Sequence, residues 1–92
     1  MKYRVLFTLY HDIKKTPVRT GYRPDWTSNH KPEYNCGQLT FQGEEIKPGY
    51  QRECVLTPVM LQLWETVITK DTLRCMEGSR QVGDAVVIEI IP

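Results

Sequence analysis

The segment KYRVLFTLYH, residues 2–11, alternates apolar and polar side chains along its length. Tyr3, Val5, Phe7 and Leu9 fall on one face, and the residues between them fall on the other. A period of two residues is typical of a β-strand with one buried face. The sequence therefore predicts that the chain begins with a strand packed against a core.

Turn residues separate further short strands along the chain. Pro48-Gly49 predicts a type II turn with Gly49 at positive φ. The residues that follow, 52–57, predict a strand that ends at Pro58.

The C-terminal third predicts a hairpin. DTLRCMEGSRQVG, residues 71–83, is expected to form a strand, a tight turn at Gly78 and a second strand. The β-branched run 85–91 is expected to be the best-buried strand. Some six short strands without a long helix predict an all-β sandwich or a small closed barrel, and 92 residues suffice for one domain.

Three segments are less regular. YRPDW, residues 22–26, predicts an edge strand or a strand entry, and SNHKPEYNCG, residues 28–37, predicts a loop. VMLQLWETVIT, residues 59–69, fits either a helical turn before a hairpin or a strand, and this alternative stays open. Met60 and Trp64 within it are expected in the core.

Composition indicates an ordinary globular protein, with 40% apolar and 25% charged residues. The N-terminus does not resemble a signal peptide, and no stretch approaches the length of a membrane span. Cys36, Cys54 and Cys75 are odd in number and widely spaced, which argues against a disulfide framework or a zinc site. We expect buried or half-buried thiols, a cytoplasmic location, no metal and no cofactor.

Charge is unevenly distributed, although the net charge is only +1. Up to Pro32 there are seven Lys and Arg against two Asp, and the remainder has five against nine Asp and Glu. KKTPVRTGYRPDW, residues 14–26, concentrates the positive charge early in the chain. Such a segment either binds an anionic partner or forms a solvated connection between strands.

No known catalytic motif is present. The sequence lacks a GxxxxGK[ST] phosphate loop, a GxGxxG fingerprint and a GxSxG elbow. His11 and Asp12 are adjacent, and two neighbours within a strand would face opposite ways and could not pair. We therefore expect a surface histidine and no enzymatic activity.

A series of short motifs extends over the whole chain: Lys14-Lys15, Thr16-Pro17, GYRP at 21–24, Pro48-Gly49, Thr57-Pro58 and EGSRQVG at 77–83. Their order resembles that of the C-terminal (third) β-barrel domain of bacterial elongation factor Tu. The resemblance implies a six-stranded antiparallel Greek-key barrel over residues 1–92 and no GTPase domain. We expect a free-standing copy of the domain, although a piece of a longer protein would give the same sequence.

The resemblance also implies where binding occurs. In that family the barrel contacts aminoacyl-tRNA and packs against the GTPase domain and the exchange factor. The basic pair before Thr-Pro and the Glu-Gly of the last hairpin are among the residues that contact tRNA there. By resemblance, the binding candidates here are Lys14, Lys15, Glu77 and Gly78.

Three other family positions differ, namely Asp25, Cys36 and Thr57, where the family has glutamine, threonine and often a basic residue. These changes favour a non-catalytic module that docks to a protein, such as a translation factor or a GTPase. The segment between Pro58 and Glu77 is longer than in the family, and a new function is expected there because loops tolerate change.

The alternative function is an RNA- or tRNA-binding module that uses the basic loop of residues 14–23. Cations would then contact phosphate while an aromatic ring stacks on a base. The additional candidates for this function are Arg19, Arg23, Arg80, and Trp26 or Tyr22 as the stacking ring. In the simplest interpretation, the loop is only a solvated connection of the barrel.

Overall fold

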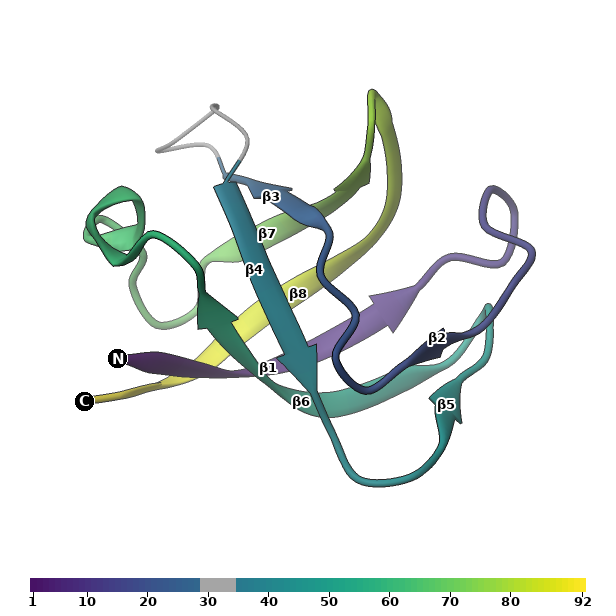
Figure 1. The fold of residues 1–92 in the computed structure, drawn as a ribbon, viewed down its shortest axis with the longest axis horizontal. Helices are drawn as coiled ribbons and strands as arrows, with labels where there is room; N and C mark the ends of the chain where they lie inside the picture. The colour runs from purple at the N-terminus through teal and green to yellow at the C-terminus, as the bar shows by residue number, and fades with distance from the viewer. Residues whose placement is uncertain (29–34) are drawn as a thin grey trace.

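Six antiparallel strands close into a barrel in the computed structural model, which describes residues 1–28 and 35–92 (Figure 1). In order around the barrel they are β1 (Lys2–Leu9), β6 (Gln51–Pro58), β4 (Asn35–Thr40), β3 (Asp25–Thr27), β7 (Thr72–Glu77) and β8 (Arg80–Ile91). Strands β3, β4 and β6 are neighbours in succession, and β6 returns to lie beside β1. This is a Greek-key arrangement, so the predicted fold class is confirmed.

Three short elements lie outside the barrel wall. β2 (Val18–Arg19) and β5 (Glu45–Ile46) form a separate two-stranded sheet. The 3-10 helix η1 (Leu61–Trp64) connects β6 to β7, and Figure 1 shows it at the opposite end of the view from β2 and β5. Among the residues that the structure describes, no helix is long and apolar enough to cross a membrane.

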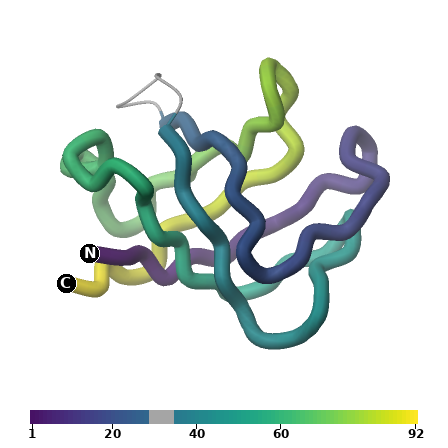
Figure 2. The backbone as a smooth tube through the Cα atoms, in the orientation of Figure 1, coloured from purple at the N-terminus to yellow at the C-terminus, as the bar shows by residue number. Residues whose placement is uncertain are grey.

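The two chain ends meet beside each other. Lys2 of β1 pairs with Ile91 of β8, which brings the termini to the same side of the barrel (Figure 2). Strand β1 therefore has a hydrogen-bonded neighbour on both sides, β6 and β8, over nearly its whole length.

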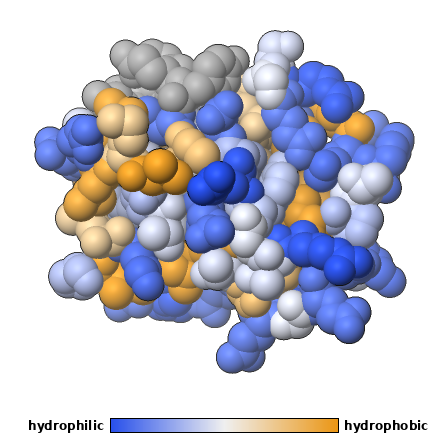
Figure 3. Space-filling view, viewed as in Figure 1, coloured by the Kyte–Doolittle hydropathy of each residue, from blue (hydrophilic) through white to orange (hydrophobic). Residues whose placement is uncertain are grey.

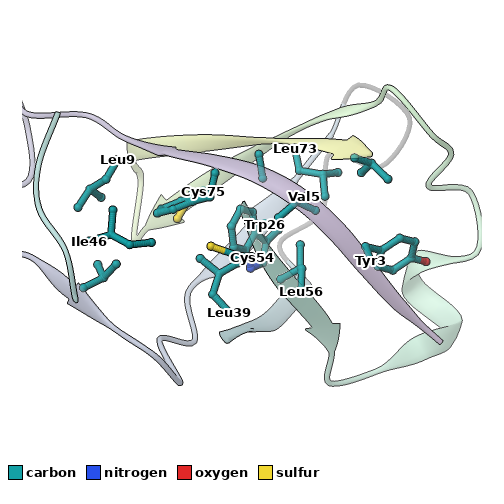
Figure 4. Packing of buried hydrophobic residues seen from close by; sticks show 14 of the residues in the cluster. Tyr3, Val5, Leu9, Trp26, Leu39, Ile46, Cys54, Leu56, Leu73 and Cys75 are labelled. Atoms are coloured by element: carbon teal, nitrogen blue, oxygen red, sulfur yellow. The ribbon is translucent and has the colours of Figure 1, made fainter. Parts of the chain in front are cut away.

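The core lies inside the barrel and follows the alternation of β1. Tyr3, Val5, Phe7 and Leu9 are completely buried, as the sequence predicted. Figure 4 shows Tyr3 at one end of the cluster, Leu9 and Ile46 at the other, and Val5 and Trp26 between them. The three thiols are free; Cys54 and Cys75 are buried and Cys36 is half-buried, as expected.

The predicted turns are confirmed. Gly49 has φ +92° and Gly78 has φ +63°, which are backbone conformations that other residues rarely adopt. Strand β6 ends at Pro58, and β7 and β8 pair across the turn at Gly78.

Of the two alternatives predicted for residues 22–26, a strand entry is confirmed, because residues 22–24 lead into β3 at Asp25, and an edge strand is wrong. Strand β3 is not an edge, because Asp25 pairs with Cys36 of β4 on one side and with Met76 of β7 on the other. A closed barrel has no edge, so even a short strand beside a proline acquires two neighbours. The predicted loop 28–37 is wrong at its end, because it includes the first residues of β4; its part at 29–34 lies outside the described residues.

The C-terminal strand is also less buried than expected. Val86 and Ile88 are exposed, while Ala85 and Val87 are buried, so β8 alternates like β1. A β-branched run indicates a strand, but it does not show that both faces are covered. Strand β1, with four completely buried side chains and only Lys2 exposed, is more buried than β8.

Candidate functional site

The fold brings the first and the last of the sequence motifs, Lys14-Lys15 and residues 77–83, into contact. The Lys14 ammonium lies 2.9 Å from Oε2 of Glu77, and the Tyr22 hydroxyl donates a hydrogen bond to the same oxygen. The Lys14 nitrogen also lies 5.8 Å from the centre of the Tyr22 ring. We call Lys14, Tyr22 and Glu77 the Lys14 corner; it fastens the loop after β1 to the β7–β8 hairpin.

Electrostatics at this corner favour the charged pair. Burial alone would raise the pKa of Glu77, but hydrogen bonds from Tyr22 and Lys14 and the nearby Lys14 charge outweigh it, so the pKa is lowered. The pKa of Tyr22 is raised by burial and by the neighbouring Cys75 and Glu77. The side chain of Lys14 is only 15% exposed, and its ammonium pairs with Glu77 rather than facing solvent.

A second tyrosine fixes the start of the same loop. The Tyr10 hydroxyl donates a hydrogen bond to Oδ2 of Asp84, and Nε2 of Gln81 donates one to the Tyr10 oxygen at 3.2 Å. Burial and the bond to Asp84 raise the pKa of Tyr10 to about 12. The loop between β1 and β2 is thus attached to β8 at one point and to the hairpin at another.

The remaining cationic candidates are exposed. Lys15 donates a hydrogen bond to the backbone oxygen of His11 at 3.3 Å. Arg19 lies opposite Glu45 in the β2–β5 pair, and Arg80 lies opposite Glu77 across the hairpin. Arg23 and Gly78, which lies at the turn between β7 and β8, are exposed too.

Trp26 cannot stack on a base, and this prediction is wrong. Its side chain is 1% exposed, its Nε1 donates a hydrogen bond to the oxygen of Gly37 at 3.0 Å, and its ring meets Phe7 edge to face. The ring is a central part of the core. Sequence reasoning missed this because a tryptophan after a proline-bound turn can face either side of a strand.

Two thiols and the histidine that the structure describes lie in different environments. Burial raises the pKa of Cys54 and of Cys75 to about 12, so neither thiol is a ready nucleophile. His11 Nε2 does approach Asp12 Oδ1, at 2.9 Å, because both residues lie in a turn after β1 rather than within it. Both are well exposed, as predicted for a surface histidine. No cluster of metal-binding side chains occurs in the described ranges.

The residues around η1 leave apolar side chains exposed. The exposed fractions are 55% for Val59, 51% for Met60, 43% for Leu61 and 56% for Ile68. We call these four residues the η1 surface, and Figure 3 shows apolar side chains at that end of the molecule. The prediction that Met60 lies in the core is wrong.

Trp64 holds the η1 segment on the barrel. It is buried and stacks on Tyr3 with the ring centres 5.7 Å apart, and the Tyr3 hydroxyl donates a hydrogen bond to the Trp64 oxygen at 3.1 Å. The prediction of a buried Trp64 is confirmed. A single helical turn cannot bury apolar residues on all sides, so the rest of this apolar segment faces solvent. The sequence signal for this surface was the length of the segment between Pro58 and Glu77 relative to the family that the motifs resemble.

No protein-family model matches the chain, and no curated protein matches it. The relationship to elongation factor Tu therefore stays a prediction from the sequence motifs. The all-β barrel itself rests on the structure.

Proposed function

We propose that this barrel is a non-catalytic binding module that docks to a protein partner through the η1 surface. The observation that carries the proposal is the exposure of four large apolar side chains within ten residues of sequence. Exposed apolar side chains that gather in one short segment, unlike those scattered singly, mark interaction sites on proteins.

The η1 surface is held in place before any partner binds. Trp64 anchors it from below, the Leu63 N–H donates to the Met60 oxygen at 3.1 Å, and the Ile68 N–H donates to Oδ2 of Asp71 at 3.0 Å. A preformed surface loses little conformational entropy on binding, which favours affinity. The side chains can therefore serve as the apolar centre of an interface.

The molecule is large enough to carry a standard interface. A standard interface covers about 800 Å² on each partner. The molecule exposes 5491 Å², so a partner centred on the η1 surface would cover a modest share of it. The resemblance to the elongation factor Tu barrel makes a cytoplasmic translation factor or a GTPase the class of partner that we propose.

RNA binding by the basic loop is the second candidate function, supported by the exposure of Lys15, Arg19 and Arg23. The Lys14 corner reduces its strength, because Lys14 already pairs with Glu77 inside the protein. A cation that must leave an internal carboxylate before it meets phosphate contributes less to binding.

The test is affinity capture from a nuclease-treated cell lysate with the wild-type chain and with the double variant Met60→Ser/Ile68→Ser. We expect a protein that the wild type retains and the double variant loses, and that binds the purified wild type directly. The triple variant Lys15→Ala/Arg19→Ala/Arg23→Ala serves as the control and should retain it. Equal retention by the wild type and the double variant would overturn the proposal.

A further inference from the structure

A groove lies at the other end of the molecule, between β5 and the start of β6. Its volume is about 260 Å³, and it is lined by Glu45, Ile46, Lys47, Tyr50, Gln51 and Arg52. The groove is near the lower end of the usual size range for small-molecule sites, about 300 to 1,000 Å³, so it suits one small unit. It is separate from the η1 surface, since Figure 1 shows the η1 segment at the opposite end of the view from β5.

The walls of the groove are fixed by the turn that joins β5 to β6. The Gly49 N–H donates to the Leu9 oxygen at 2.7 Å, the Leu9 N–H donates to the Tyr50 oxygen at 3.0 Å, and the Tyr50 N–H donates to the Lys47 oxygen at 3.1 Å. Since Gly49 has φ +92°, the turn requires glycine at this position. Lys47 and Tyr50 are therefore presented by a turn tied to the end of β1.

Arg52 is oriented but not neutralised. Its Nη1 donates a hydrogen bond to the Gln42 oxygen at 2.6 Å, and its guanidinium carbon lies 5.7 Å from the centre of the Phe41 ring. Within the described part of the chain, neither Arg52 nor Lys47 forms an ion pair. A guanidinium has five N–H donors, so Arg52 keeps donors for an anion such as phosphate.

An aromatic ring accompanies the two cations. Tyr50 is 63% exposed, the highest exposed fraction among the large hydrophobic residues of the described ranges. Glu45 is the one carboxylate in the lining, and Arg19 is its register partner on β2. A stacking ring beside cations is the arrangement that binds a nucleotide of a single strand.

We propose that this groove binds a phosphorylated nucleoside, with the base against Tyr50 and the phosphate against Lys47 and Arg52. The nucleoside comes either from single-stranded RNA or from a free mononucleotide. This inference does not rest on the protein-docking function, since it uses a different surface and different residues.

The test is a titration of the full chain with a fluorescein-labelled U10 oligonucleotide by anisotropy and with AMP by calorimetry, at two salt concentrations. Tyr50→Ser and Lys47→Ala are the informative variants because both side chains are exposed. We expect Tyr50→Ser to weaken binding by about 5- to 160-fold. Lys47→Ala should reduce the slope of log K against log salt by about 0.7. Lys2→Ala, which removes an equal charge from an exposed position at the start of β1, should match the wild type.

Each outcome bears on the groove. Binding of U10 without AMP identifies a strand, and binding of both identifies a nucleotide unit; either result supports the groove if Tyr50→Ser and Lys47→Ala weaken it. No binding of either probe overturns the proposal. U10 binding that is lost in Lys15→Ala/Arg23→Ala but unchanged in Tyr50→Ser also overturns it, because the basic loop would then hold the RNA.

Discussion

The Lys14 corner and the η1 surface differ in which side chains reach solvent. Charged residues are part-buried at the corner, whereas apolar residues are exposed at the η1 surface. The corner carries charge in the sequence, yet Lys14 and Glu77 pair with each other and with Tyr22 in a part-buried contact. The η1 surface is apolar in the sequence, yet Val59, Met60, Leu61 and Ile68 stay exposed around the buried Trp64.

This difference shows which residues remain available to a partner. A charged side chain that is neutralised inside the protein has little left for a ligand, because breaking the internal pair costs what the new contact gains. An exposed apolar side chain has no internal partner to give up on docking, and it gains about 25 cal/mol for each Å² removed from water. We therefore propose that a partner docks at η1 and that the corner has a structural role.

The largest expected effect concerns the anchor of the η1 surface. Trp64→Ala should destabilise the protein by about 3 to 5 kcal/mol, because it removes a buried indole and its stacking on Tyr3. Chemical denaturation measures this loss. Trp64→Phe is the matched control: Nε1 of Trp64 is buried without a hydrogen-bond partner in the described structure, so losing that N–H should cost little. A small effect of Trp64→Ala would show that η1 is not held by this residue.

The next largest effect is the pH dependence of the stability that Glu77 contributes through the Lys14 corner. The folded-state pKa of Glu77 lies below its ordinary value of 4.5, so the pair's stabilisation is complete above that value and is lost as the pH falls through the folded pKa. Glu77→Gln should remove about 1 to 2 kcal/mol at pH 7 and less at lower pH. Denaturation midpoints of both proteins between pH 7 and pH 3 should converge. A constant difference over this range would contradict the account of the corner.

A smaller effect distinguishes two adjacent lysines. Lys14→Ala should cost about 1 kcal/mol, since it breaks the contact to Glu77, whereas Lys15→Ala should change stability by less than about 0.5 kcal/mol. Thermal unfolding of the two single variants measures the difference. Equal values would mean that Lys14 is as solvated as Lys15.

Much of the barrel could be predicted from the sequence because its signals are local. The alternation in β1 and the turns at Gly49 and Gly78 each depend on a few neighbouring residues. The partners of β3 could not be predicted, since barrel closure is decided by contacts between distant strands.

The candidate site was only partly predictable for the same reason. The motifs selected Lys14 and Glu77, but their mutual contact depends on how the loop after β1 meets the hairpin. The apolar pattern of residues 59–69 suggested core packing, and the available core space admits Trp64 and Val67 but leaves Met60 in solvent. How many apolar residues a core can accept is a property of the whole fold.

The most direct test of the central claim compares both regions in one binding experiment with the captured partner. Met60→Ser/Ile68→Ser should weaken the Kd at least about tenfold, because it removes two apolar contacts, and should change the free energy of unfolding by less than about 1 kcal/mol. Lys14→Ala should lower stability and leave the Kd within about twofold. Loss of binding in Lys14→Ala, with an unchanged Kd in Met60→Ser/Ile68→Ser, would contradict the account.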